Sequence, residues 1–109
     1  MHIFKIKKMV VDDDNHSMHI LSMMIKMYCM NKPITAENGQ LALEVHLKYF
    51  LQTCCSTKIE MIIMDLQMPV MDGFKSAENI LALHENMRQD PAYSHIKKPK
   101  IYALVDKVW

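Results

Sequence analysis

The chain has 109 residues, of which 50% are hydrophobic and 23% are charged, with only two glycines and four prolines. This composition is that of one globular domain, and it excludes a disordered or low-complexity chain. Thirteen basic and twelve acidic side chains leave a formal net charge of +1, which gives no general attraction to nucleic acid or to an anionic membrane. The three cysteines, Cys29, Cys54 and Cys55, make a poor disulfide framework, so we expect a reducing, cytoplasmic setting.

Apolar residues recur along the chain with spacings that alternate between those of strands and those of helices. Short apolar runs predict buried strands at 9–11, 34–36, 59–64 and 101–105. Spacings of three and four residues predict helices at about 17–30, 41–50 and 74–84. Four strands that alternate with three helices imply parallel strands joined by crossover helices, which is an open α/β sheet.

The first predicted helix, from about Ser17 as its cap to Met30, is rich in methionine, of which the chain has 12. Its expected apolar face consists of Ile20, Leu21, Met24, Met27 and Tyr28. The simplest interpretation is a core that tolerates methionine, since this side chain fills irregular gaps. An alternative is a Cu(I) site, because His16, His19, Met23 and Met27 share helical spacing. We expect most of the six histidines to lie on the surface.

Acidic residues follow two of the predicted strands: Asp12 and Asp13 end the first, and Asp65 ends the third. The carboxyl ends of parallel strands meet at one edge of an open sheet, where ligands bind. If these two strands are neighbours, three carboxylates converge there. Like charges about 4 Å apart repel by roughly 1 kcal/mol in water and about 4 kcal/mol at an effective dielectric of 20, so the cluster needs a proton or a hard cation. Oxygen ligands suit Mg²⁺, and a carboxylate beside it can accept a phosphoryl group.

Other interpretations of the acidic segment fit less well. Taken alone, residues 12–14 match a solvated loop that caps a helix. A calcium-binding EF-hand loop fails because its sixth position is Ser17 and its twelfth is Met23, where glycine and glutamate are needed. A zinc site fails because His16 and His19 have no second pair of ligands. With neither a glycine-rich phosphate loop nor a helix-turn-helix motif, we expect no nucleotide hydrolysis and no direct nucleic-acid binding.

Two segments together resemble the receiver domain of two-component response regulators, the CheY-like family. They are residues 9–15 (Met-Val-Val-Asp-Asp-Asp-Asn) and residues 61–73 (Met-Ile-Ile-Met-Asp-Leu-Gln-Met-Pro-Val-Met-Asp-Gly). The second segment is similar to receivers attached to hybrid histidine kinases, and the turn at Asn38-Gly39 also matches. The resemblance covers residues 7–105. It implies a flavodoxin-like fold, with a three-layer, doubly wound parallel sheet.

The resemblance implies a role for each acidic residue. Asp65 would be the phosphoacceptor, taking phosphate from a histidine on a kinase or a phosphotransfer partner. Asp13 would bind Mg²⁺ directly, and Asp12 would hold a metal-bound water. Gln67 would supply its backbone carbonyl to the metal, which leaves its side chain free to vary.

Other positions either match or depart from the family pattern. Pro69 and Gly73 would shape the loop after the phosphoacceptor, with Gly73 in a backbone conformation that other residues resist. The family's Ser or Thr at the end of the fourth strand is replaced by Val105, which has no hydroxyl, so the switch position is lost. Asp106 follows where the family has a small residue, and Lys107 lies too close to the fourth strand to be the family's lysine.

We therefore expect residues 1–109 to form a single receiver domain that lacks the last helix, strand and helix of the family, truncated after the fourth strand. The apolar area left uncovered on the first helix and the sheet would favour self-association. Two functions remain open. The chain accepts phosphate from a histidine kinase or histidine phosphotransfer protein with Mg²⁺ as cofactor, or it is a degenerate pseudo-receiver that binds partners without phosphorylation. Receivers are signalling domains and not enzymes in the turnover sense.

Overall fold

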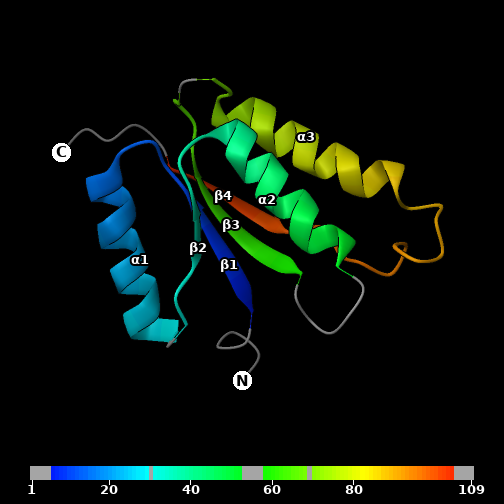
Figure 1. Cartoon of the computed structure of the whole chain (residues 1–109), viewed down its shortest axis with the longest axis horizontal. Coiled ribbons are helices and arrows are strands. Elements are labelled where there is room, and N and C mark those ends of the chain that lie inside the picture. The colour runs from blue at the N-terminus through cyan, green and yellow to red at the C-terminus, as the bar shows by residue number, and fades with distance from the viewer. Residues whose placement is uncertain (1–5, 30, 53–57, 69, 105–109) are drawn as a thin grey trace.

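The structure, a computed structural model, describes residues 6–29, 31–52, 58–68 and 70–104. Strands and helices alternate along this part of the chain (Figure 1), in the order β1 (Lys7–Val11), α1 (Asn15–Cys29), β2 (Ile34–Ala36), α2 (Gly39–Leu51), β3 (Ile59–Asp65), α3 (Gly73–Asn86) and β4 (Lys100–Leu104). The predicted order of elements is confirmed, and most of their ends differ from the prediction by only one or two residues. No helix in the described ranges is both long and apolar enough to cross a membrane.

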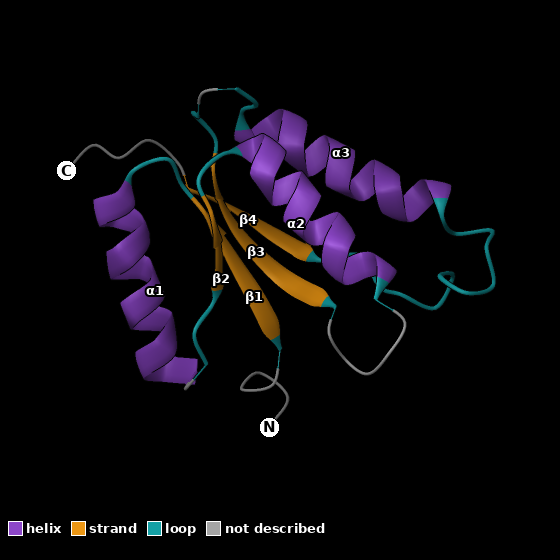
Figure 2. Cartoon of the chain, in the orientation of Figure 1, coloured by secondary structure: helices purple, strands orange, loops and turns teal. Residues whose placement is uncertain are grey.

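The four strands form one parallel sheet in the order β2-β1-β3-β4. Val11 of β1 lies opposite Ala36 of β2 on one side and Met64 of β3 on the other. Helices α2 and α3 pack side by side on one face of the sheet, and α1 lies on the other face (Figure 2). This arrangement confirms the predicted three-layer, doubly wound α/β fold. It also brings the carboxyl ends of β1 and β3 to the same edge.

The main hydrophobic core lies between the sheet and the α2–α3 layer. Met9 of β1 and Ile62 of β3 are opposite each other in the register and are completely buried. Ala42 of α2 and Ile80 of α3, also completely buried, cover them from the helical side. Each large apolar side chain buried in this way stabilises the fold by about 1.5–3 kcal/mol relative to leaving it exposed. The core therefore fixes the positions of β1 and β3, the two strands whose carboxyl ends carry acidic residues.

The expected apolar face of α1 is largely exposed, in agreement with the expectation that apolar area of the first helix is left uncovered. Ile20 and Met24 are 44% and 49% exposed, and Met27 and Tyr28 are 70% and 73% exposed. Of the predicted face only Leu21 is half-buried. Apolar residues occur almost all the way around this helix, so their spacing could not determine which side meets the sheet. Self-association through these residues stays a prediction.

Candidate functional site

Three carboxylates lie together at the carboxyl edge of the sheet. Asp12 directly follows β1, and Asp65 is the last residue of its parallel neighbour β3. One carboxylate oxygen from each of Asp12, Asp13 and Asp65 lies within 4.8 Å of the others. Asp12 and Asp65 are buried, whereas Asp13 is exposed. The strand order thus produces the convergence that the sequence predicted.

Backbone hydrogen bonds place Asp12 at the end of its strand. Its backbone N–H donates to the carbonyl oxygen of Ala36 at 3.1 Å, which continues the ladder between β1 and β2 by one residue. Its side-chain Oδ1 accepts a hydrogen bond from the backbone N–H of Asp14 at 3.0 Å, which turns the chain away from the sheet. Asp12 is therefore held through both its main chain and its side chain.

Asp14, and not Ser17, caps α1. Its Oδ1 accepts a hydrogen bond from the backbone N–H of His16 at 3.1 Å, and its Oδ2 accepts one from the hydroxyl of Ser17 at 2.8 Å. The helix begins at Asn15, two residues before the predicted cap. A carboxylate at this position satisfies backbone donors that have no partner within the helix and faces the positive end of the helix dipole. The third aspartate of the run thus has a structural role, while the first two join Asp65.

The chain after Asp65 makes a tight loop back to α3. The Oδ1 of Asp65 accepts a hydrogen bond from the backbone N–H of Gln67 at 3.1 Å, and the N–H of Gly73 donates to the carbonyl of Leu66 at 3.1 Å. A Cβ atom at Gly73 would overlap the carbonyl oxygen of Asp65. The need for glycine here is real, but the predicted reason is wrong. Gly73 has no positive φ, and it is the close approach of α3 to the end of β3 that excludes a side chain.

The positive φ in this loop belongs to Val70, at 69°. A β-branched residue in the left-handed region is strained, at a cost of about 1–2 kcal/mol. The side chain is 83% exposed, so it gains little burial in return. Sequence reasoning gave no sign of this strain. The predicted loop-shaping residue Pro69 and the predicted switch position Val105 lie outside the described residues.

The same loop is fastened to the start of α2. The backbone N–H of Gly39 donates to the carbonyl of Met71 at 3.1 Å, and the hydroxyl of buried Ser76 donates to the carbonyl of Gly39 at 2.8 Å. A Cβ atom at Gly39 would overlap the Met71 carbonyl oxygen. The sequence indicated a turn at Asn38-Gly39 but not this contact, because the partners are more than thirty residues away along the chain. The β3–α3 loop is thus tied to a second helix as well as to β3.

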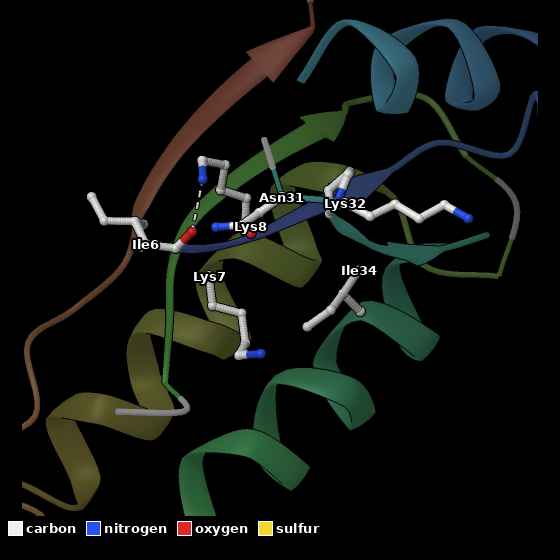
Figure 3. A pocket seen from close by; sticks show the side chains of 7 residues that line it. Ile6, Lys7, Lys8, Asn31, Lys32 and Ile34 are labelled. Atoms are coloured by element: carbon white, nitrogen blue, oxygen red, sulfur yellow. Dashed lines mark hydrogen bonds between the residues drawn. The ribbon is translucent and has the colours of Figure 1, made fainter. Parts of the chain in front are cut away.

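A cavity of about 270 Å³ lies beside the start of β1 (Figure 3). None of the three clustered aspartates lines it. Three lysines line it, but their ammonium groups point in different directions. The Lys7 ammonium lies 5.1 Å from the ring centre of Tyr49, and that of Lys8 donates to the carbonyl of Ile6 at 2.8 Å. Because these charges do not converge, the cavity does not compete with the acidic cluster as a candidate site.

The histidines divide into two groups: three of the five described ones, His16, His19 and His95, are exposed as expected, whereas His46 and His84 are buried. His16 and His19 are exposed on α1, together with Met23 and Met27, so the proposed copper ligands line an open helix surface. His46 is only 2% exposed. Its position four residues after Ala42 and four before Phe50, both buried, was a helical signal that could have placed it in the core.

Comparison with known proteins identifies the family. The model of the response regulator receiver domain family matches residues 9–90. No curated protein matches the chain. Among solved structures, the receiver domain of the histidine kinase CKI1 from Arabidopsis thaliana, complexed with Mg²⁺ and BeF₃⁻, aligns with a TM-score of 0.77 and 22% identity, over 93% of this chain and 66% of that one.

A second solved structure has the same fold. It is the receiver domain of the Saccharomyces cerevisiae response regulator Ssk1 in complex with the histidine phosphotransfer protein Ypd1. It aligns with a TM-score of 0.73 and 22% identity, over 90% of this chain and 61% of that one. The chain thus spans less than two thirds of the length of these structures, at 66% and 61%. The family model matches most of the residues, and the structure has the receiver fold. The chain therefore belongs to the response regulator receiver domain family.

Proposed function

We propose that this chain accepts a phosphoryl group on Asp65, with Mg²⁺ bound by the carboxylates of Asp12, Asp13 and Asp65 and by the backbone carbonyl of Gln67. The donor would be a phosphohistidine on a histidine kinase or on a histidine phosphotransfer protein. The observation that carries the proposal is the position of the three carboxylates, with one oxygen of each within 4.8 Å of the others at the carboxyl edge of the sheet.

The donor set fits Mg²⁺. All three side chains offer hard oxygen ligands, and Mg²⁺ is usually bound by one or two carboxylates while keeping several waters. Two of the three carboxylates are buried, which strengthens their mutual repulsion and therefore the need for a cation. When bound, Mg²⁺ would neutralise negative charge on the transferring phosphoryl group. The exposed side chain of Asp13 leaves this cluster accessible from solvent.

Residues of the chain itself would carry out the transfer and position the reacting carboxylate. A carboxylate oxygen of Asp65 would attack phosphorus, forming an O–P bond as the N–P bond to the donor imidazole breaks, and the imidazole nitrogen leaves with the bonding electron pair. The hydrogen bond from the Gln67 N–H to Oδ1 restricts rotation of the Asp65 side chain. The hydrogen bond of the Asp12 N–H to Ala36 keeps the second buried carboxylate in place. Positioning of this kind reduces the entropy lost when the reacting groups meet.

The test is phosphorylation by a small donor. The full chain is incubated with acetyl phosphate and Mg²⁺, and intact mass spectrometry should detect one added phosphoryl group. The Asp65→Asn variant should gain none, because an amide cannot form the acyl phosphate. Beryllofluoride with Mg²⁺ should shift the NMR resonances of residues around Asp65 in the wild-type chain and not in this variant.

Two further variants separate metal binding from phosphate acceptance. Asp12→Asn and Asp13→Asn each remove one negative charge from the cluster, so both should weaken Mg²⁺ binding in calorimetric titration and slow the reaction with acetyl phosphate. Asp14→Asn is the matched control, since it keeps a capping side chain and lies outside the cluster. A chain that binds Mg²⁺ but never gains mass would contradict the proposal. That result would favour the pseudo-receiver alternative, which was inferred from Val105 and Asp106.

A further inference from the structure

Two histidines face each other inside the interface between α2 and α3. His46 of α2 and His84 of α3 are 2% and 5% exposed, and their Nε2 atoms are 2.9 Å apart, a hydrogen-bonding distance. We call these two residues the histidine pair. They are 38 positions apart in the sequence, so their contact joins two separate helices. Among the described residues, no third His, Cys, Asp or Glu completes a metal-binding group with them.

When both rings are neutral, the hydrogen bond fixes the tautomer of each ring. A neutral imidazole has one N–H and one lone pair, so one ring donates from Nε2 and the other accepts at Nε2. The donating ring then has its free lone pair at Nδ1, and this is where an added proton would bind. The Nδ1 atoms of both rings are buried with no hydrogen-bond partner in the described part of the structure. An added proton would therefore create a buried cation, which has no acceptor for its new N–H at His46 and is favoured only by the backbone of Ile96 at His84.

The surroundings of the histidine pair do not compensate such a charge. The Phe50 ring contacts His84 edge-on, with centroids 4.8 Å apart, and Tyr93 stacks on Phe50 at 5.2 Å. From the segment before β4, the positive charge of Lys98 acts on His84. The neighbouring carboxylate of Glu85 is exposed and already paired with Lys98 and Arg88.

These contacts agree with the direction in which the histidines titrate. Burial, and then the proximity of His84, lowers the pKa of His46 from 6.5 to about 4. Burial and the charge of Lys98 also lower the pKa of His84, while the backbone of Ile96 acts in the opposite direction. At the C-terminal end of α2, the Lys58 ammonium donates to backbone carbonyls, including that of Phe50, and adds a second positive charge to this region.

We propose that the histidine pair is a pH-sensitive contact that holds α2 against α3 near neutral pH and releases the ends of these helices that lie away from the acidic site when the pH falls. The near ends stay joined by the bonds of Gly39 to Met71 and of Ser76 to Gly39, which contain no titrating group. Acidification would thus open the helical layer from one end. The proposal does not depend on phosphorylation of Asp65.

The sign of the effect follows from proton binding. In the unfolded chain the histidines have ordinary pKa values near 6.5, whereas in the folded chain that of His46 is about 4. Between these values the unfolded chain binds more protons, so lowering the pH favours it. The stability contributed by the neutral pair is complete above pH 6.5, is lost as the pH falls through this window, and is gone below about 4.

The test compares acid sensitivity in matched variants. Urea unfolding is measured at several pH values for the wild-type chain and for the double variant His46→Leu/His84→Leu, which replaces both polar partners with apolar ones. Between pH 6.5 and 4 the folding constant of the wild type should fall more than that of the double variant, by on the order of a hundredfold. The control is His16→Gln/His19→Gln on exposed α1, which should follow the wild type. Equal acid sensitivity in the wild type and the Leu double variant would overturn the proposal.

A second measurement on the wild-type chain does not rely on the variant folding. NMR titration of the imidazole carbon-bound protons should show His46 protonating near pH 4 and His84 protonating below its ordinary range, and amide exchange in the C-terminal halves of α2 and α3 should accelerate as they protonate. Exchange that stays constant through the titration of these two residues would rule out a contact that opens on protonation. So would a His46 whose pKa stays near 6.5 in the folded chain.

Discussion

Helices rich in apolar residues cover both faces of the sheet, but the apolar side chains on the two faces are buried to different extents. On the α2–α3 face, Met9, Ile62 and Ile80 are completely buried, and even a histidine of α2 lies inside. On the α1 face, Met24 remains 49% exposed and Tyr28 73% exposed. The acidic site lies at the edge between them, and its loop is fastened to the α2–α3 side. We infer that the α2–α3 face supplies most of the stability and positions the site.

The largest expected effect is a cavity in the well-packed face. Ile80→Ala should lower the free energy of unfolding by about 2–5 kcal/mol, because a buried side chain is lost and the surroundings close only partly. Met24→Ala on α1 removes a half-exposed side chain and should cost less than about 1 kcal/mol. Urea denaturation of both variants measures the difference. Equal losses would show that the two faces contribute alike.

The next effect is that of pH on the same face. Because the pKa of His46 is lowered from 6.5 to about 4, its neutral burial should contribute about 3 kcal/mol that is lost as the pH falls through this window. The measurement is the free energy of unfolding at both ends of the window in the wild type and in His46→Leu. The exposed His19 on α1 offers the matching control, His19→Gln. A control variant that changed the acid dependence as much as His46→Leu would remove the distinction between the faces.

Two buried serines test how polar groups are satisfied on each face. Ser76→Ala should cost about 1–3 kcal/mol, because the carbonyl of Gly39 loses its hydrogen bond from the Ser76 hydroxyl. The hydroxyl of Ser22 on α1 is buried without a hydrogen-bond partner among the described residues, so Ser22→Ala should be neutral or stabilising. Thermal unfolding of the two variants gives the comparison. A loss of stability in Ser22→Ala would show a partner for its hydroxyl.

The smallest difference is expected at the helix caps. Asp14 accepts the backbone N–H of His16 at the start of α1, and Asp72 accepts that of Lys75 at the start of α3. Asp14→Ala and Asp72→Ala should each lower the free energy of unfolding by about 1 kcal/mol, whichever face the helix covers. Circular dichroism during urea unfolding measures both. Similar losses of stability in the two variants would show that the faces differ in side-chain packing. A much larger loss at one cap would show that they differ in how their helix termini are stabilised.

Sequence reasoning predicted the acidic site better than it predicted the helices around it. Asp12, Asp13 and Asp65 could be placed together because each follows a recognisable strand and parallel strands end at one edge. The need for glycine at position 73 was also predicted, but its cause was not, since the overlap is with the Asp65 backbone and not within the residue itself. Contacts of this kind depend on how closely one element approaches another. The local pattern of the sequence carries no information about that approach.

The helices show the same limit. Apolar residues surround α1 on most sides, so their spacing was compatible with several orientations, and the chosen face proved largely exposed. His46 and His84 lie at helical spacing from buried neighbours, but their polarity argued for the surface. Only the packing of α2 on α3 places their Nε2 atoms 2.9 Å apart and makes burial possible. The strain at Val70 likewise has no local signature in the sequence.

By itself the amino-acid sequence determined the alternation of strands and helices and the acidic residues at two strand ends, because both follow from short-range periodicity and the geometry of parallel sheets. The tertiary structure alone decided which face of α1 is covered, why Gly73 must lack a side chain, and that two histidines meet inside the helical layer. The physical reason is that burial and close approach are properties of pairs of elements. Their energies arise only when segments distant in the sequence come into contact.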